Sequence, residues 1–154
     1  MSNDGFYSQR VNGASFLVEV DGVEIGRFTE VTGLQVDIAV EEVTEGGENS
    51  YTHKLPGRMS WPNIVLKRGV TQNDSLLKWL NKSSGDGFAV GGNKLKRSTA
   101  AITLVGGGNV RLRTWEFDGA FPIKWTGPKF AAGSNEVPEE ELEIAHHGFR
   151  AKDL

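Results

Sequence analysis

Apolar and polar residues alternate along several short segments of the chain, which is the period of a β-strand with one buried face. The first such segment, SFLVEVDGVEIGRF, carries apolar runs on both sides of Asp21 and Gly22. An Asp-Gly pair between two such runs is a strong signal for a two-residue hairpin turn, because both residues tolerate positive φ. The pattern therefore predicts antiparallel strands near residues 15–20 and 23–28.

The next segment, LQVDIAVEEV, places apolar residues on one face of a strand and mainly polar residues on the other. The apolar face comprises Leu34, Val36, Ile38 and Val40. This pattern predicts a half-buried strand. The following stretch, EGGENSYTHKLPGRMS, has neither the strand period nor the helix period, and it is longer than most connections in compact domains. We expect a long ordered loop over residues 44–60.

One helix is predicted, over residues 73–82 in the stretch TQNDSLLKWLNKSSG. Asn73 or Asp74 supplies the N-cap, and an apolar stripe follows it. The stripe comprises Leu76, Leu77 and Leu80. Just before the helix, WPNIVLKRG is interpreted as a strand with Pro62 near its start, because proline cannot donate to a strand ladder.

The second half of the chain predicts further strands. STAAITLVGGGNVRLRTWEF is typical of a hairpin with glycines at its tip, and a change in apolar phase between Val110 and Phe117 indicates a bulge near Arg113. AFPIKWTGP predicts a separate short strand. EEELEIAHHGF predicts a final strand, because Leu142 and Ile144 alternate with glutamates.

The element order indicates the fold class. About eight strands and one helix, with no alternation of strands and helices, disfavour a parallel sheet. We expect a mainly β protein, a small antiparallel β-barrel or sandwich with one packed α-helix. The 154 residues fit a single domain, residues 1–154, with an N-terminal arm over residues 1–14.

Composition narrows the function classes. The chain contains no cysteine, which excludes disulfides, thiolate metal sites and cysteine nucleophiles. Its 20 glycines exceed the average usage of about 7% and suit a β-rich chain with many turns. A net charge of -3 argues against a nucleic-acid binder whose affinity comes from neutralising phosphates. Partners are therefore expected to be recognised by shape.

Candidate catalytic and metal-binding groups are few. His146 and His147 are neighbours on a predicted strand and point to opposite faces, so a structural or surface role is favoured over metal binding. The glutamates between Glu136 and Glu143 are interpreted as a solvated face, because a run of carboxylates does not fix the separation that an acid and base pair needs. The tryptophans are interpreted as core aromatics. They are Trp61, Trp79, Trp115 and Trp125. We expect no enzyme activity, no cofactor and no metal site.

Five segments in a fixed order carry a resemblance to a known family. They are FLVEVDGVEIGRFTEVTGL, EEVTEGGEN, HKLPGRMSWPNIVLKRGVT, WEFDGAFPIKWTGP and NEVPEEELEIAHHGF. From about Phe16 to Phe149 the chain resembles the tail tube protein family of contractile-tailed phages and related contractile injection systems. The resemblance implies a fold similar to the ring protein of type VI secretion, which agrees with the many strands and single helix read from the pattern.

The resemblance also implies a structural inner tube protein. Such subunits form hexameric rings that stack into a hollow tube inside a contractile sheath, and the lumen conducts DNA or protein cargo. Closing a ring gives a physical use for open sheet edges, which would otherwise aggregate. The implied partners are further copies of the chain, the sheath protein, baseplate or hub proteins, tube-terminating proteins and the cargo.

A role for the long loop follows from this resemblance. We expect residues 44–60 to project into the next ring, with Tyr51 and Leu55 as apolar anchors and charged contacts beside them. The candidates for inter-ring or subunit contact are Glu45, Asn49, Tyr51, Lys54, Leu55 and Arg58. The alternating Glu141 and Glu143 are candidates for an acidic lumen wall.

The expected location is the cytoplasm during assembly, because the sequence shows neither a secretory signal pattern nor a run long enough to span a membrane. The protein is then expected in a phage tail or phage tail-like particle, which can be released from the cell. Two alternatives stay open. One is a secreted ring protein of the type VI kind that carries effectors, and the other is a stand-alone β-sandwich module that binds a ligand.

Overall fold

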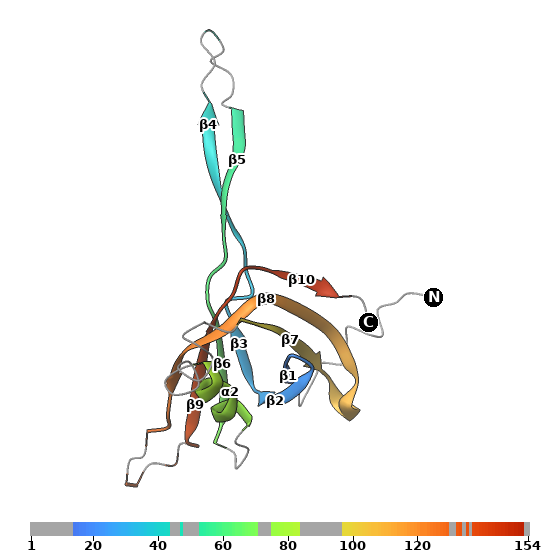
Figure 1. Cartoon of the computed structure of the whole chain (residues 1–154), viewed down its shortest axis with the longest axis vertical. Coiled ribbons are helices and arrows are strands. Elements are labelled where there is room, and N and C mark those ends of the chain that lie inside the picture. The colour runs from blue at the N-terminus through green and yellow to red at the C-terminus, as the bar shows by residue number, and fades with distance from the viewer. Residues whose placement is uncertain are drawn as a thin grey trace.

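The computed structural model describes residues 14–43, 47, 53–70, 75–83, 97–129, 132–133, 135 and 137–152 (Figure 1). Its strands are β1 (Ser15–Val20), β2 (Val23–Phe28), β3 (Glu30–Thr32), β4 (Asp37–Val43), β5 (His53–Ser60), β6 (Ile64–Gly69), β7 (Ser98–Val105), β8 (Arg111–Thr126), β9 (Glu139–Ala145) and β10 (Phe149–Lys152). The helical elements are α2 (Ser75–Ser83) and the short 3-10 turn η1 (Gly107–Asn109).

Most strands form one curved antiparallel sheet. Neighbouring strands follow the order β2-β1-β7-β8-β9-β6-β3, and β10 pairs with β8 beside this path. The two ends of the path, β2 and β3, follow each other directly in the chain, and between them the Thr29 N–H donates to the Lys67 carbonyl at 2.9 Å. Among the described residues no ladder joins β2 to β3, so the sheet curls around its core without closing into a barrel. The expectation of an antiparallel, mainly β fold with a packed helix is confirmed.

The β1–β2 hairpin turns where the sequence predicts. Val20 pairs with Val23, which leaves Asp21 and Gly22 as the two turn residues. Both have positive φ, 50° and 80°, as a two-residue turn matching the strand twist requires. The predicted hairpin is therefore confirmed.

The helix α2 fills the hollow of the curved sheet. The sequence placed it over residues 73–82, and the structure shows it at Ser75–Ser83, while the proposed capping residues Asn73 and Asp74 lie outside the described residues. Its buried residues are Leu76 and Trp79. Leu77 is exposed, so the leucine stripe was only partly right, and the tryptophan provides the main contact.

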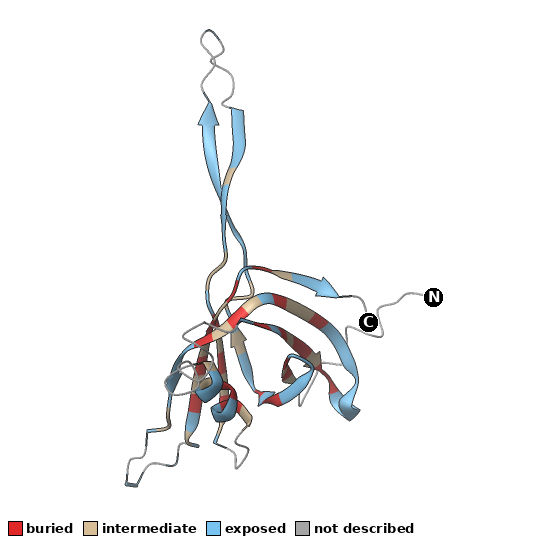
Figure 2. Ribbon diagram, in the orientation of Figure 1, coloured by how far each residue is buried: buried red, intermediate tan, exposed pale blue. Residues whose placement is uncertain are grey.

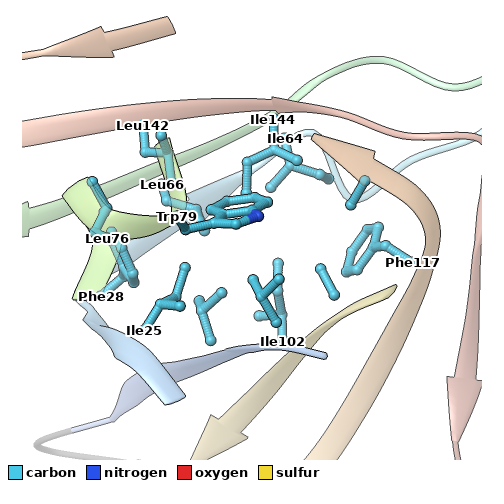
Figure 3. Packing of buried hydrophobic residues seen from close by; sticks show 14 residues of the cluster. Ile25, Phe28, Ile64, Leu66, Leu76, Trp79, Ile102, Phe117, Leu142 and Ile144 are labelled. Atoms are coloured by element: carbon cyan, nitrogen blue, oxygen red, sulfur yellow. The ribbon is translucent and has the colours of Figure 1, made fainter. Parts of the chain in front are cut away.

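The indole of Trp79 enters the core from α2 and lies between the two walls of the sheet (Figure 3). Ile64 and Ile144 stand on one side of it, and Ile25 and Ile102 on the other. Burying an aromatic ring and its neighbours in this way supplies a large share of the hydrophobic stabilisation of a small domain. The helix therefore completes a core that the strands mainly build.

The β7–β8 hairpin has the predicted glycine tip and the predicted bulge. Leu104 pairs with Arg113 and Val105 with Arg111, so β8 has one extra residue next to Arg113. The expectation of a separate short strand over AFPIKWTGP was wrong, because β8 continues without a break to Thr126. The prediction placed a strand boundary near Pro122, because proline rarely lies inside a paired strand. Pro122 is tolerated inside the strand because it lies at a further register shift, in the pairing of β8 with β9.

The β4–β5 hairpin differs most from the sequence expectation. The segment expected as a loop over 44–60 contains strand β5, which pairs with β4 in a two-stranded sheet of its own. The segment expected as a half-buried strand is exposed at every position from Asp37 to Val43. Figure 2 shows the hairpin as a projection from the body of the molecule. Alternation correctly indicated a strand, but no described element covers its apolar face.

Candidate assembly surfaces

The β4–β5 hairpin presents apolar side chains on both faces. Cross-strand pairs put Ile38 beside Met59 and Val40 beside Pro56 on one face, while Leu55 lies across from Glu41 on the other. The exposed fractions are 48% for Ile38, 58% for Val40, 53% for Met59 and 49% for Leu55. A two-stranded hairpin is marginally stable in water on its own. Exposed apolar rows of this kind mark a surface that a partner covers.

Three of the predicted contact residues can be placed on this hairpin. Lys54, Leu55 and Arg58 lie on β5 and are exposed. The other three, Glu45, Asn49 and Tyr51, lie outside the described residues. The sequence reading missed four exposed apolar residues on the same hairpin. They are Ile38, Val40, Val43 and Met59. The sequence did contain a signal for them. A strand with one apolar face, followed by a long connection, can pack that face against another chain as well as against its own core.

The base of the hairpin is tightly built. Gly33, between β3 and β4, has φ of 91°, and a Cβ added there would lie 2.1 Å from the backbone carbonyl oxygen of Asn63. That carbonyl belongs to the segment joining β5 to β6. The close approach of the two chain segments therefore requires glycine, and it fixes where the hairpin leaves the sheet.

A second group of exposed apolar residues lies at the opposite end of the sheet. It consists of Val70 after β6, Ile123 and Trp125 on β8, and Val137 before β9. Strand register brings these segments to one edge, because Gly69 pairs with Glu139 and Thr126 pairs with Glu141. In Figure 1 the ends of β6 and β8 and the start of β9 lie at the far end of the molecule from the β4–β5 hairpin. We call these four residues the distal patch.

A buried ion pair lies beneath the distal patch. Arg68 donates from Nε to Glu140 Oε1, and these two side chains are 4% and 10% exposed. Trp125 Nε1 donates to the other Glu140 oxygen at 3.2 Å, and the Arg68 guanidinium lies 4.9 Å from the Phe28 ring centroid. Gly26 makes room for this arginine, because an added Cβ would lie 2.0 Å from Arg68 Nη1.

Two sequence interpretations are corrected by this network. Glu140 is buried and paired, so it does not belong to a solvated face with its neighbours. Trp125 is 37% exposed, so it is not a core aromatic. Both assignments used residue type alone. A charged residue was assigned to the surface and an apolar residue to the core, because the partners across the sheet are not known from the sequence.

The candidate lumen residues lie on the opposite side of β9 from this network. Glu141 approaches Lys67 at 4.0 Å, and Glu143 accepts a hydrogen bond from Asn63 at 3.0 Å. Both glutamates are half-buried, while Leu142 between them is fully buried. The alternation predicted for this strand is confirmed, whereas the face it presents in an assembly stays a prediction.

His146 has a structural environment. Its Nδ1 accepts from the Gly148 N–H at 3.0 Å, so Nε2 carries the proton and donates to the Pro62 carbonyl at 2.9 Å. The ring also packs edge-on against Phe117, with centroids 5.0 Å apart. His147 is exposed and its Nε2 lies 2.6 Å from an Arg97 nitrogen. Within the described part of the chain, no three His, Cys, Asp or Glu side chains gather as a metal site would need.

The described helix is too short and too polar to cross a membrane.

Comparison with known proteins identifies the family. Residues 12–150 match the family of the T4-like virus tail tube protein gp19, so the chain is a member of that family. None of the curated proteins matches the sequence.

Solved structures agree with this assignment. A chain of the extracellular contractile injection system PVC sheath-tube complex in the extended state is 25% identical, with a TM-score of 0.75 and coverage of 100% of this chain and 99% of that one. A chain of the PVC sheath/tube terminator is 28% identical, with a TM-score of 0.71 and coverage of 90% and 93%. A type six secretion system protein shares the fold at 12% identity, with a TM-score of 0.56 and coverage of 89% and 82%.

Proposed function

We propose that this chain is the inner tube subunit of a contractile tail or injection system, and that it forms hexameric rings stacked into a hollow tube. The observation that carries the proposal is the end-to-end similarity to a chain of a sheath-tube complex, over 100% of this chain and 99% of that one. Family membership over residues 12–150 supports the same role. The role is structural, since the subunit contributes shape and contacts rather than bond chemistry.

The form of the subunit supports assembly. Its β4–β5 hairpin exposes apolar residues on both faces, and burying them against other copies removes that area from water at about 25 cal/mol per Å². A closed ring covers sheet edges, and a head-to-tail contact between rings extends until a different protein caps it. Such an arrangement yields a long tube from one kind of subunit.

The projecting segment 44–60 is proposed as the contact between rings. Lys54, Leu55 and Arg58 are exposed on β5, in agreement with a contact role. Glu45, Asn49 and Tyr51 remain candidates from the sequence. A charged residue in place of Leu55 or Tyr51 is expected to block tubes and leave the subunit folded. Normal polymerisation of those variants would remove the segment from the interface.

The tube is proposed to act as a conduit that the contracting sheath drives through a target envelope. Glu141 and Glu143 are the proposed residues of an acidic lumen wall. The proposed partners are the sheath, the baseplate or hub and the tube-terminating proteins, in keeping with the sheath-tube and terminator assemblies that contain similar chains. Assembly is proposed to take place in the cytoplasm, followed by incorporation into a phage tail-like particle.

Electron microscopy of the concentrated purified protein tests the proposal. Rings with six-fold symmetry or stacked tubes are the expected result, either from the protein alone or after addition of a baseplate that nucleates growth. A protein that stays monomeric even with its baseplate present would rule out the tube function. In that case the ligand-binding module would become the leading alternative.

A further inference from the structure

We propose that the distal patch receives the β4–β5 hairpin of a second copy of this chain, with Trp125 as its central anchor. This inference rests on the proposed stacking of rings and deepens it, because it names the surface that accepts the hairpin.

The first support is exposure. Val70, Trp125 and Val137 are 51%, 37% and 75% exposed, although they flank a tightly packed core. Val70 is held next to the segment before β9 by a hydrogen bond from its N–H to the Pro138 carbonyl at 3.1 Å. Val137 lies near Gly69 at the end of β6. Apolar side chains gathered where three neighbouring strands end form a surface suited to a partner.

The second support is the fixed orientation of Trp125. Its Nε1 donates to Glu140, which is itself held by buried Arg68, and the indole packs over Gly127, where an added Cβ would lie 3.0 Å from the ring. An exposed tryptophan ordered before binding loses little side-chain entropy on docking, and this is a feature of the residues that dominate interfaces. The buried ion pair thus fixes the orientation of the exposed Trp125 side chain.

The third support is the complementarity of edge and charge. Beyond Ala120, strand β8 pairs with β9 on one side, and among the described residues no strand pairs with its other side. Lys124 and Lys129 are exposed there and form no ion pair with any described residue. Strand β4 of the hairpin carries Asp37, Glu41 and Glu42, all exposed. An acidic strand with exposed valine and isoleucine complements a basic edge with exposed tryptophan and isoleucine.

The fourth support is position. The hairpin and the distal patch lie at opposite ends of the long axis of the molecule (Figure 1). A contact between two different surfaces at opposite ends is heterologous and repeats along an axis, which is the requirement for stacking rings. A contact between two copies of the same surface would instead end growth at a pair.

Two variants with complementary defects test the assignment. The hairpin variant Ile38→Asp keeps an intact patch, and the patch variant Trp125→Gln with Val137→Asp keeps an intact hairpin. Glutamine retains an N–H donor for Glu140, and Val137 is 75% exposed, so both changes spare the core. Rings of each variant are prepared separately, examined by electron microscopy, and then mixed in equal amounts. Circular dichroism checks that each variant is folded.

Each variant alone is expected to stop at single rings, and the mixture is expected to give particles two rings long. Only one hairpin–patch contact can form in the mixture, so growth stops there. Tubes of normal length from the patch variant alone would overturn the inference, and so would a mixture that stays as single rings.

The control variant is Val110→Asp, a valine of 56% exposure at the β7–β8 turn, and normal tubes are expected from it. A control that also stops at single rings would overturn the assignment, because charge at any exposed valine would then suffice. Wild-type protein that forms no rings or tubes even with a baseplate would contradict the proposed function itself. Wild-type tubes together with patch-variant tubes would contradict only the present inference.

Discussion

At the scale of single residues, adjacent positions on β9 have opposite environments. Glu140 and Glu141 are consecutive glutamates, yet the first is buried against Arg68 and the second is half-exposed beside Lys67. A strand sends successive side chains to opposite faces, so one residue determines whether a carboxylate meets solvent or core. The sequence predicted this alternation from Leu142 and Ile144, and applying the same phase to Glu140 would have placed it inside. It was interpreted as solvated because its partner, Arg68, lies on a different strand.

The two glutamates form a matched pair of test sites. Glu140→Gln is expected to lower the free energy of unfolding by about 3 to 5 kcal/mol, because it leaves the buried Arg68 charge without a counter-charge. Glu141→Gln is expected to cost less than about 1 kcal/mol, since both side chains of that pair are more than a third exposed and their atoms are 4.0 Å apart. Urea unfolding in the Ile38→Asp background measures both without a contribution from stacking. Equal losses for the two variants would show that the Arg68–Glu140 pair does not stabilise the fold.

Gly33 offers a second test at this scale. Gly33→Ala is expected to destabilise the subunit by about 2 kcal/mol or more, because the residue has φ of 91° and the new Cβ would collide with the Asn63 carbonyl oxygen. Gly107→Ala is the control, since nothing lies within 4 Å of its added Cβ, and a change within about 0.5 kcal/mol is expected there. Thermal unfolding of the two variants provides the comparison. A Gly33→Ala protein as stable as the control would mean that the hairpin base can shift to accommodate a side chain.

At the scale of elements, strands with one covered face were predicted better than strands whose role is to meet another chain. The β1–β2 turn and the bulge near Arg113 depend on local chemistry, so Asp21-Gly22 and a shift of apolar phase were sufficient to find them. Strand β5 was missed because Pro56 and Gly57 interrupt its pattern and β4 is its only described strand partner. Because β5 does not pack on the core, its sequence lacks the alternation of a strand with one buried face. Among the site residues, Lys54, Leu55 and Arg58 were named from the sequence as contact candidates, whereas the distal patch depends on strand register, which the sequence does not reveal.

Strand β10 is held to β8 partly by charge, and this attachment depends on pH. Glu116 on β8 forms ion pairs with Lys152 at 3.2 Å and with Arg150 at 3.1 Å. These partners hold the pKa of Glu116 below its ordinary value of 4.5, and the hydrogen bond from Lys152 has the largest effect. Because the pKa of Glu116 is lower in the folded state, its ion pairs stabilise the fold fully above pH 4.5. This stabilisation is lost as the pH falls through the folded-state pKa. Wild type is therefore expected to exceed Glu116→Gln in stability at neutral pH.

The pH dependence is measured as the difference in unfolding free energy between wild type and Glu116→Gln, followed from pH 7 to pH 3. Other carboxylates titrate in both proteins, so their effect cancels in the difference. The difference should be constant near neutrality and disappear in acid. A difference that grows as the pH falls would have the wrong sign for a lowered pKa, and the ion pairs would not be the cause.

At the scale of the whole molecule, the subunit combines a packed body with a projecting hairpin that no other described element covers. The body has a buried core under the curved sheet, while the β4–β5 hairpin is exposed along both strands. The exposed area makes sense only if the functional unit is larger than one chain. The stability of the hairpin is then expected to depend on assembly, whereas the stability of the body is not.

Limited proteolysis separates these two states of the hairpin. Trypsin is expected to cut after Lys54 and Arg58 in single, unstacked rings, because both residues are exposed on β5 and the hairpin can open locally. In tubes the same sites are expected to be cut at least about ten times more slowly, since each opening must first break the contact with the next ring, and each 1.4 kcal/mol of contact gives a factor of ten. Mass spectrometry of timed digests of single Ile38→Asp rings, whose hairpins are undocked, and of wild-type tubes gives the two rates.

Lys129 extends this experiment to the other end of the subunit. It is exposed beside β8, so a hairpin docked on the distal patch should slow cleavage after Lys129 together with cleavage after Lys54. Equal cleavage rates at Lys54 in tubes and in single rings would contradict a buried hairpin. Protection at Lys54 without protection at Lys129 would mean that the hairpin docks on another part of its neighbour. We expect protection at both sites, because the hairpin and the distal patch lie at opposite ends of the long axis.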